Sequence, residues 1–523
     1  VKNITTGFSN NQTIVGGNGV TDNNNGDQPS IPDIDNPEQD DDVIAVEAGL
    51  YKTGTNYTEL IYSWDYLLSE KIIEVHSGRI SVSISNPDYS REILDGDLVF
   101  PNDSSIKEFN GDGFSNCKKL KNVILGNGFV NLAYGFRLCS SLETVVVSET
   151  VTTIGNWAFD NCQSLTKVVI KGNVVTIEDN AFSYCKLLKE INIPNSVQSI
   201  QTYAFEYCSS LETIILPDGL SVLERGVFRD CSSLKEIVIP ENVTYLYETF
   251  RGCTNLQTVV LKGDTQIREM AFLDCKQLSS INLGNINTIG ESAFKNCKAL
   301  TTINFPNALT SIGNNAFQWS DISGNIVLPE GLEIIGNSAF YYCPNLTGVQ
   351  FPSTLKTIGN EAFNTCEKIT ELTLPYGLEN IGQNAFRNCT GLKSIVIPDS
   401  VTTVGNAAFS YCYNVETAVL SSSMTMISES MFAECWRLKN ISIPDGITII
   451  GASAFANDTA MKEIALPSSI ETLQKNAFRS CYNIENIYFD GDETQWNNII
   501  KETDWDYYLG VNADNHTYTV HYN

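Results

Sequence analysis

The sequence predicts a repeat solenoid in which stacked parallel β-strands are joined by short helical turns, in about 17 coils of 22–23 residues capped at both ends. Three observations predict it. A phenylalanine recurs every 22–23 residues, a cysteine follows it by three residues in almost every unit, and a short apolar strand ending near a proline occupies the same place in many units. A fixed period of this size is typical of solenoids, because each unit buries its apolar side only against its neighbours.

The recurring phenylalanine occurs 17 times over 365 residues, from Phe114 to Phe478. Cysteine is replaced in only two units, by Ser320 and Asp458. A buried phenylalanine side chain stabilises the folded chain by roughly 2–3 kcal/mol, so this column is expected to be a main source of stability.

The spacing within one unit predicts its local structure. Ile191 and Ile193 are two residues apart and therefore share one face of a strand, which Pro194 ends because proline lacks an amide donor. Alanine, phenylalanine and cysteine at the spacing of Ala204, Phe205 and Cys208 fit a single helical turn. In many units an Ile-Gly pair precedes that turn, and we expect the glycine to supply the positive φ of a corner.

The 15 cysteines have three interpretations. They lie 22, 23 or 46 residues apart without any CxxC pair, and the only histidines are outside the cysteine-bearing stretch, so no zinc site is expected. Buried apolar filler is the preferred interpretation. Disulfides between coils are permitted by a spacing of about 4.8 Å but opposed by parallel Cβ directions. Reactive thiols need a neighbouring base or cation, which this column lacks.

The ends of the chain differ in composition from the repeats. Residues 1–43 carry eight acidic groups and one basic group with few apolar residues, which predicts a flexible acidic linker. Residues 44–94 are predicted to form an N-terminal cap, residues 95–489 the solenoid, and residues 490–523 a C-terminal cap with Trp496 on a short helix. Exposed solenoid ends invite edge-to-edge association, so both ends are interpreted as caps.

Charge and hydropathy narrow the function classes. The net charge of −28 disfavours nucleic acid and anionic lipid, which require basic surfaces. No apolar stretch approaches the roughly 18 residues of a spanning helix, so we expect no direct membrane insertion. The sequence begins at Val1, which either a trimmed secretory or lipoprotein leader or a cloning choice explains.

The repeat resembles the BspA-like class of leucine-rich repeats. Units of the form I-P-x-x-V-x-x-I-G-x-x-A-F-x-x-C-x-x-L occur almost verbatim, for example from Ile397 through Phe409 to Cys412, and the resemblance covers roughly residues 95–489. It implies a bacterial protein that is secreted or displayed on the cell surface, often an adhesin that contacts host or matrix proteins. The class has no shared catalytic residues, so the resemblance implies no enzyme and no cofactor.

Two candidate binding sets follow from the repeat. The strand position between the two core residues points outward, and 11 of its 17 residues are apolar, although β-branched residues favour strands without any ligand. The aromatic residues just before the cysteine form the second set, which either binds a partner or merely covers the core edge. The candidates in the strand position are Ile124, Val146, Val169, Ile215, Val238, Val260, Val327, Val396, Val419 and Tyr488, and those before the cysteine are Tyr184, Tyr207, Tyr342 and Tyr411.

The sequence therefore predicts a non-catalytic, adhesin-like binding protein at the cell surface or outside the cell, possessing no cofactor or metal site. Host or matrix proteins or glycans are the expected partners, and we expect a monomer tethered through the N-terminal linker. One alternative is a structural spacer with no ligand of its own. Another is a glycan-acting enzyme, because Asp and Glu are abundant enough to supply a carboxylate pair.

Overall fold

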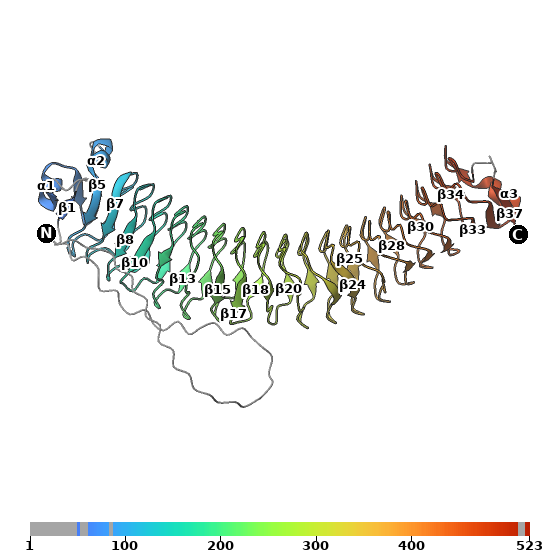
Figure 1. The fold of residues 1–523 in the computed structure, drawn as a ribbon, viewed down its shortest axis with the longest axis horizontal. Helices are drawn as coiled ribbons and strands as arrows, with labels where there is room; N and C mark the ends of the chain where they lie inside the picture. Colours follow the sequence, from blue (N-terminus) through green and yellow to red (C-terminus); the bar gives the residue numbers. More distant parts are fainter. Residues whose placement is uncertain (1–49, 53–60, 83–86, 511–517) are drawn as a thin grey trace, which may run out of the picture. The chain divides into compact units, whose positions relative to one another are not determined.

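The computed structural model describes residues 50–52, 61–82, 87–510 and 518–523. The chain divides into two units, Val1–Val46 and Glu47–Asn523, and every described residue belongs to the second. The predicted linker at residues 1–43 lies outside the described residues. The second unit is the predicted solenoid, a stack of about 17 coils in chain order (Figure 1).

Most coils contribute one strand to a first row of parallel strands, which carries the predicted outward position. The coils of Ile215, Asn304 and Thr373 have no strand on this side. The strands pair with the next coil in parallel, as Thr144 does with Lys167, so the same position of every coil lies in one column. This first strand row consists of β5 (Asp95–Val99), β7 (Lys119–Ile124), β8 (Thr144–Val147), β10 (Lys167–Ile170), β12 (Glu190–Ile191), β15 (Glu236–Ile239), β17 (Thr258–Leu261), β19 (Ser280–Ile281), β22 (Gly324–Val327), β24 (Leu346–Gln350), β27 (Ser394–Val396), β29 (Thr417–Val419), β31 (Asn440–Ser442), β33 (Glu463–Pro467), β35 (Asn486–Asp490) and β37 (Thr519–Tyr522).

A second row of two-residue strands forms another side of the stack. Apart from β36, each has an isoleucine, leucine or valine that is buried in the core, such as Ile200 in β13, which pairs with Leu223 in the next coil. This row consists of β9 (Thr153–Ile154), β11 (Thr176–Ile177), β13 (Ser199–Ile200), β14 (Val222–Leu223), β16 (Tyr245–Leu246), β18 (Gln266–Ile267), β20 (Thr288–Ile289), β21 (Ser311–Ile312), β23 (Ile334–Ile335), β25 (Thr357–Ile358), β26 (Asn380–Ile381), β28 (Thr403–Val404), β30 (Met426–Ile427), β32 (Ile449–Ile450), β34 (Thr472–Leu473) and β36 (Ile500–Lys501).

The third side of the stack is a row of turns, where the helical-turn prediction was wrong. Ala204, Phe205 and Cys208 do share the buried face, but the segment forms consecutive turns with no α-helix. Every second amide donates to the next coil instead, as the Phe205 N–H does to the Val227 carbonyl oxygen at 2.9 Å. The amides between them bond three residues back within the turn, as the Cys208 N–H does to the Phe205 carbonyl oxygen at 3.2 Å, so the backbone groups are satisfied partly within each coil and partly between coils.

The predicted role of the Ile-Gly glycine was also wrong. Gly313 and Gly359 do not have a positive φ; in a typical coil the left-handed residues are two non-glycine residues, such as Asn180 at 56° and Tyr184 at 58°. A Cβ on Gly359 would lie 2.6 Å from the backbone carbon of Gly336 in the preceding coil. In the coils that have glycine at this corner, neighbouring backbones approach so closely that a Cβ would not fit.

The phenylalanines form a continuous stacked ladder through the core. Neighbouring rings from Phe136 to Phe478 have centroids 5.2–5.9 Å apart and planes within 13° of parallel. Rings turned edge-on meet the ladder at its two ends, Phe100 against Phe114 and Trp505 against Phe478. The capping role predicted for the terminal segments stays a prediction, but the structure shows where the stacking pattern stops.

The described terminal segments contain the remaining elements. β1 pairs antiparallel with both β2 and β5, and β5 in turn pairs in parallel with β7, as the strand-like sequence Leu98-Val99-Phe100-Pro101 predicts. The predicted helix around Trp496 is confirmed, begins at an Asp492–Gln495 capping box, and buries the indole. These elements are β1 (Leu50–Lys52), β2 (Ile61–Ser63), α1 (Trp64–Ser69), β3 (Ile73–His76), β4 (Arg79–Val82), α2 (Pro87–Ile93), β6 (Glu108–Phe109) and α3 (Glu493–Asn498).

The cysteine column lies beside the phenylalanine ladder. All 15 cysteines are buried and free of disulfides, which supports the filler interpretation. The thiol hydrogen of a cysteine points to the preceding coil, where the Cys366 Sγ donates to the Phe340 carbonyl oxygen at 3.1 Å. Burial raises the pKa of the Cys343 and Cys412 thiols to about 12. These thiols therefore stay protonated at neutral pH.

Thiol titration is expected to separate the folded and unfolded chains sharply. The thiolate is the reactive form, and a buried thiol with a raised pKa presents almost none of it. A chromogenic disulfide reagent at pH 8 should leave the folded protein unlabelled over minutes and find close to 15 thiols in denaturant. Rapid labelling of several thiols in the folded protein would contradict the burial of this column.

Candidate functional site

The first strand row carries an outward stripe, which we define as the residue between the two core positions of each strand. In β10, Val168 and Ile170 are buried while Val169 between them is partly exposed. The predicted outward orientation is confirmed, since none of the stripe residues is buried. Residues of the stripe are Ile124, Val146, Val169, Asn192, Ile215, Val238, Val260, Asn282, Asn304, Val327, Gln350, Thr373, Val396, Val419, Ser442, Ala465 and Tyr488.

Several aliphatic side chains of the stripe are largely exposed. Ile215 is 68% exposed, Val327 is 59% exposed and Val396 is 55% exposed. Val146, Val169, Val238 and other members are partly covered by neighbouring coils. A partner surface can remove these exposed aliphatic groups from water, which is favourable.

The stripe is interrupted in a way that the sequence analysis missed. The Asn192 side chain donates to the carbonyl oxygen of Ile170 at 2.9 Å and accepts from the Ile170 N–H at 2.8 Å. It thereby takes the place of the next backbone ladder bonds, and β12 ends at Ile191. Ile215 in the following coil lies in an extended segment outside the assigned strands, which corrects its expected place on a strand.

A charged rim borders the stripe. The Lys235 Nζ lies 2.6 Å from a Glu212 carboxylate oxygen, and Lys439 lies 3.0 Å from Glu416, each across one coil boundary. The hydrogen bond from Lys235 and its charge lower the pKa of Glu212, and Lys439 lowers the pKa of Glu416 in the same way. Solvated pairs of this kind stabilise little, so the rim sets the charge pattern around the stripe rather than the stability of the fold.

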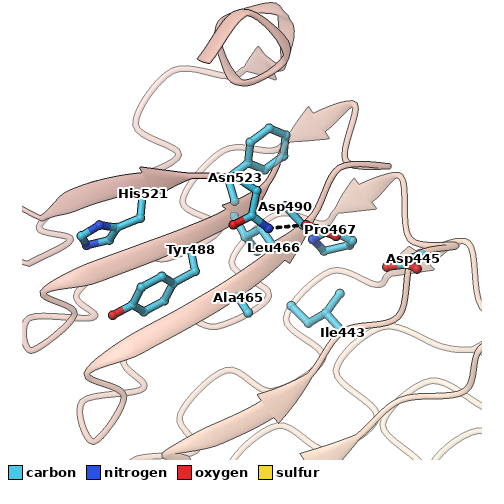
Figure 2. A pocket seen from close by; sticks show the side chains of 10 residues that line it. Ile443, Asp445, Ala465, Leu466, Pro467, Tyr488, Asp490, His521 and Asn523 are labelled. Carbon is cyan, nitrogen blue, oxygen red and sulfur yellow. Dashed lines mark hydrogen bonds between the residues drawn. The ribbon is translucent and has the colours of Figure 1, made fainter. Parts of the chain in front are cut away.

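At the C-terminal end the stripe runs into a shallow depression of about 300 Å³ (Figure 2). The His521 imidazole stacks on the Tyr488 ring with centroids 4.8 Å apart, so His521 continues the stripe on β37. The alternation in the terminal strand could have revealed this position. The lining residues are Ile443, Asp445, Ala465, Leu466, Pro467, Tyr488, Phe489, Asp490, His521 and Asn523.

The aromatic residues before the cysteines lie on the turn row, apart from the stripe. Tyr184 and Tyr207 stack with centroids 4.6 Å apart, whereas Tyr411 lies 4.7 Å beneath the Arg387 guanidinium. Tyr342 is also exposed, and all four have a positive φ. The structure therefore brings Tyr184 and Tyr207 together but leaves the set as a whole scattered.

Among the residues that the structure describes, no three His, Cys, Asp or Glu side chains gather as metal ligands. No helix in the described part of the chain is long and apolar enough to span a bilayer.

Comparisons with solved structures find other leucine-rich-repeat proteins. A leucine-rich repeat protein from Bacteroides ovatus is 19% identical with a TM-score of 0.34, and the match covers 91% of this chain and 99% of that one. A leucine-rich cell surface protein from Faecalibacterium prausnitzii is 24% identical with a TM-score of 0.31, over 82% and 95% of the two chains. No curated protein matches the chain.

The family model for the BspA type leucine rich repeat region matches this chain in six overlapping copies. Together they span residues 96–485, well over half of the sequence. The individual matches are residues 96–212, 132–257, 175–300, 247–370, 310–435 and 356–485. The match coincides with the stacked coils and with the repeat motif that the sequence contains, and the chain therefore belongs to the family of proteins built from BspA-type leucine-rich repeats.

Proposed function

We propose that this protein is a non-catalytic, adhesin-like binding protein that acts at the cell surface or outside the cell. Its outward stripe contacts a host or matrix protein, and the charged rim orients that partner. The observation that carries the proposal is the exposure of aliphatic side chains, above all Ile215, Val327 and Val396, along one column of the stack. Burying these groups against a partner is favourable, whereas nothing in the stack itself requires them to be apolar.

Membership of the BspA-type repeat family supports this proposal, as does the relative from Faecalibacterium prausnitzii described as a cell surface protein. A repeated column suits a binding role, because each coil offers one side chain at a fixed spacing of about 4.8 Å. A partner with complementary groups at that spacing gains contacts from many coils at once. Host and matrix proteins are the proposed partners, and the solenoid acts as a monomer.

The test is binding of the full chain to an array of extracellular-matrix proteins, followed by a stripe variant. Replacing Ile215, Val238 and Val260 together by threonine keeps β-branched side chains while removing apolar surface. Affinity for the partner is expected to fall by about tenfold or more, since truncated interface anchors cost more than 1 kcal/mol each. Surface plasmon resonance measures this change directly.

Tyr376→Thr provides the matched control, because Tyr376 is 88% exposed and lies outside the stripe. It should leave partner affinity unchanged. Equal binding by the stripe variant and the unmodified chain would move the contact to another face. An array without any saturable binding would overturn the proposal and favour the spacer.

A further inference from the structure

The glycine column is interrupted in one block of coils. Most coils from Gly290 onward, and the coil of Gly155, have glycine at the corner where backbones approach closely. Glu178, Gln201, Glu224 and Arg268 occupy this corner in the coils between. In the remaining coil of the block Leu246 precedes Phe250 by four residues rather than five, so the corner is one residue shorter. Polar side chains at this corner bond to neighbouring coils, as Glu178 does by accepting from the Asn156 N–H at 3.0 Å and Glu224 by accepting from the Tyr245 hydroxyl at 3.1 Å.

Three arginines in this block converge on one carboxylate. The Arg225 Nη2 donates to Glu248 Oε1 at 2.8 Å, and the Nη1 atoms of Arg229 and Arg251 both lie 3.9 Å from Glu248 Oε2. The Arg225 guanidinium also lies over two tyrosine rings, 5.0 Å from the Tyr247 centroid and 5.9 Å from that of Tyr203. Four of the chain's ten arginines lie between residues 225 and 268, which makes this the densest group of guanidinium groups.

The Glu248 carboxylate is buried, and the guanidinium groups around it are more exposed to solvent. The Glu248 side chain is 4% exposed, whereas that of Arg225 is 44% exposed. Glu248 Oε2 is buried without a hydrogen bond, so the carboxylate serves to hold the arginines in place. One side of Arg225 is occupied by Glu248, and a guanidinium has five N–H donors, so donors remain for a ligand.

The tyrosines are also held in fixed positions. Gly226 has a φ of +63°, and a Cβ there would lie 2.3 Å from the Tyr203 ring, so the ring packs directly on this backbone. Arg229 lies 3.5 Å from a Glu206 oxygen and 3.4 Å from an Asp230 oxygen. Burial raises the pKa of Glu206, while Arg229 opposes this shift. Guanidinium groups, carboxyl groups and aromatic rings are thus fixed side by side on the turn row.

We propose that this Arg–Tyr patch, formed by Tyr203, Arg225, Arg229, Tyr247 and Arg251, binds a carboxylate-bearing sugar of a glycan. The sugar carboxylate accepts paired hydrogen bonds from the outer edge of Arg225, the geometry for which a guanidinium is suited. The apolar C–H face of the pyranose ring packs against tyrosine, and its hydroxyl groups donate to the Glu206 and Asp230 carboxyl groups. The inference rests on the proposed binding function and adds a second face and a ligand class.

Local charge favours a sugar over an acidic protein segment. The chain has a net charge of −28, and here three guanidinium groups balance the carboxyl groups of Glu206, Asp230 and Glu248. An anionic group therefore meets a locally balanced surface with guanidinium donors at this patch, whereas the net negative charge of the chain repels it elsewhere. An acidic peptide brings several charges into the repulsive surroundings, whereas one sugar residue brings a single charge to the patch.

The experiment compares sialyllactose with lactose on the full chain by isothermal titration calorimetry at low salt. The two probes differ by the carboxylate-bearing sugar, and lactose is expected to bind at least about tenfold more weakly. The double variant Arg225→Gln/Glu248→Gln removes the guanidinium group that pairs with the sugar carboxylate, and it also removes the buried Glu248 charge that would otherwise lose its Arg225 partner. It is expected to lose sialyllactose binding by a similar factor, while Arg225→Lys, which keeps the charge, retains an intermediate affinity.

Arg479→Gln is the matched control, because Arg479 follows Phe478 as Arg229 follows Phe228 but lies many coils away. It should bind sialyllactose like the unmodified chain. Equal affinity for both probes, no binding of either, or tighter binding of a hexaglutamate peptide would each overturn the proposal. If the Arg225 variant still binds the matrix protein and the stripe variant does not, the proposed function of the stripe is supported independently of the Arg–Tyr patch.

Discussion

Replacing Phe340 by alanine is expected to destabilise the solenoid by about 3–5 kcal/mol. Phe340 is fully buried and stacks between Phe317 and Phe363, with centroids 5.2 Å from each. Removing the ring leaves a cavity in the core and breaks the stacking on both sides. The two neighbouring coils cannot close the gap, because hydrogen bonds of the strand and turn rows fix the spacing between them.

Urea denaturation followed by circular dichroism measures this loss as a lower midpoint. Phe340→Leu, which fills most of the space, should lose clearly less, and Tyr376→Ala at an exposed position should change little. In a stack where each coil contacts its neighbours, the alanine variant should also unfold in a broader transition, since the weakened interface separates two halves. A variant with the midpoint of the unmodified chain would show that the ladder does not limit stability.

Replacing Asp458 is expected to stabilise the protein by about 1–3 kcal/mol near neutral pH, the cost of a buried polar group without a partner. Asp458 stands in the cysteine column and is completely buried. Its Oδ1 accepts from the Cys435 N–H at 2.8 Å, but its Oδ2 has no hydrogen bond. Asp458→Cys restores the residue found in most other coils, and Asp458→Asn keeps the shape while removing the ionisable group.

The stabilisation should depend on pH in a defined direction. Burial raises the pKa of Asp458 well above its usual 3.8, so the folded chain holds a proton that the unfolded chain releases. Stability from this group is therefore present below pH 3.8 and is lost as the pH rises towards the raised pKa. The difference in unfolding free energy between Asp458→Asn and the unmodified chain should grow as the pH rises from 3.8 towards the raised pKa. A difference that stays constant over this range would place the carboxyl in a solvated environment.

The regular part of the fold follows from the sequence because identical side chains recur at one period. The recurrence of Phe and Cys predicts the core columns. The spacing of Ile191 and Ile193 predicts a strand that continues to Pro194, but β12 ends at Ile191 because the Asn192 side chain replaces the next ladder bonds. The corner could not be predicted in the same way. Left-handed residues such as Asn180 and Tyr184 lack any glycine signal, since hydrogen bonds to the next coil hold them in place. Glycine is needed instead because the backbones of neighbouring coils approach each other closely at this corner, and that contact exists only once the coils are stacked.

In the candidate sites too, features set by local spacing were predictable and features set by contacts between coils were not. The outward stripe follows from alternation along each strand, so its orientation was predictable. The ladder-breaking contact of Asn192 was not, because its partner Ile170 lies 22 residues earlier in the preceding coil. The Arg–Tyr patch also assembles residues from several coils, and no local motif marks it. The interruption of the glycine column was the available signal, but it acquires meaning only once the role of the glycine is known.

The three hydrogen-bonded rows have a mechanical consequence. Each coil is held by the coil before it and the coil after it, so tension applied at one end is resisted by one interface at a time. A released coil of 22–23 residues lengthens from a rise of about 4.8 Å to roughly 75 Å of extended chain. The solenoid can therefore lengthen under tension in small steps, dissipating force while the remaining coils stay stacked.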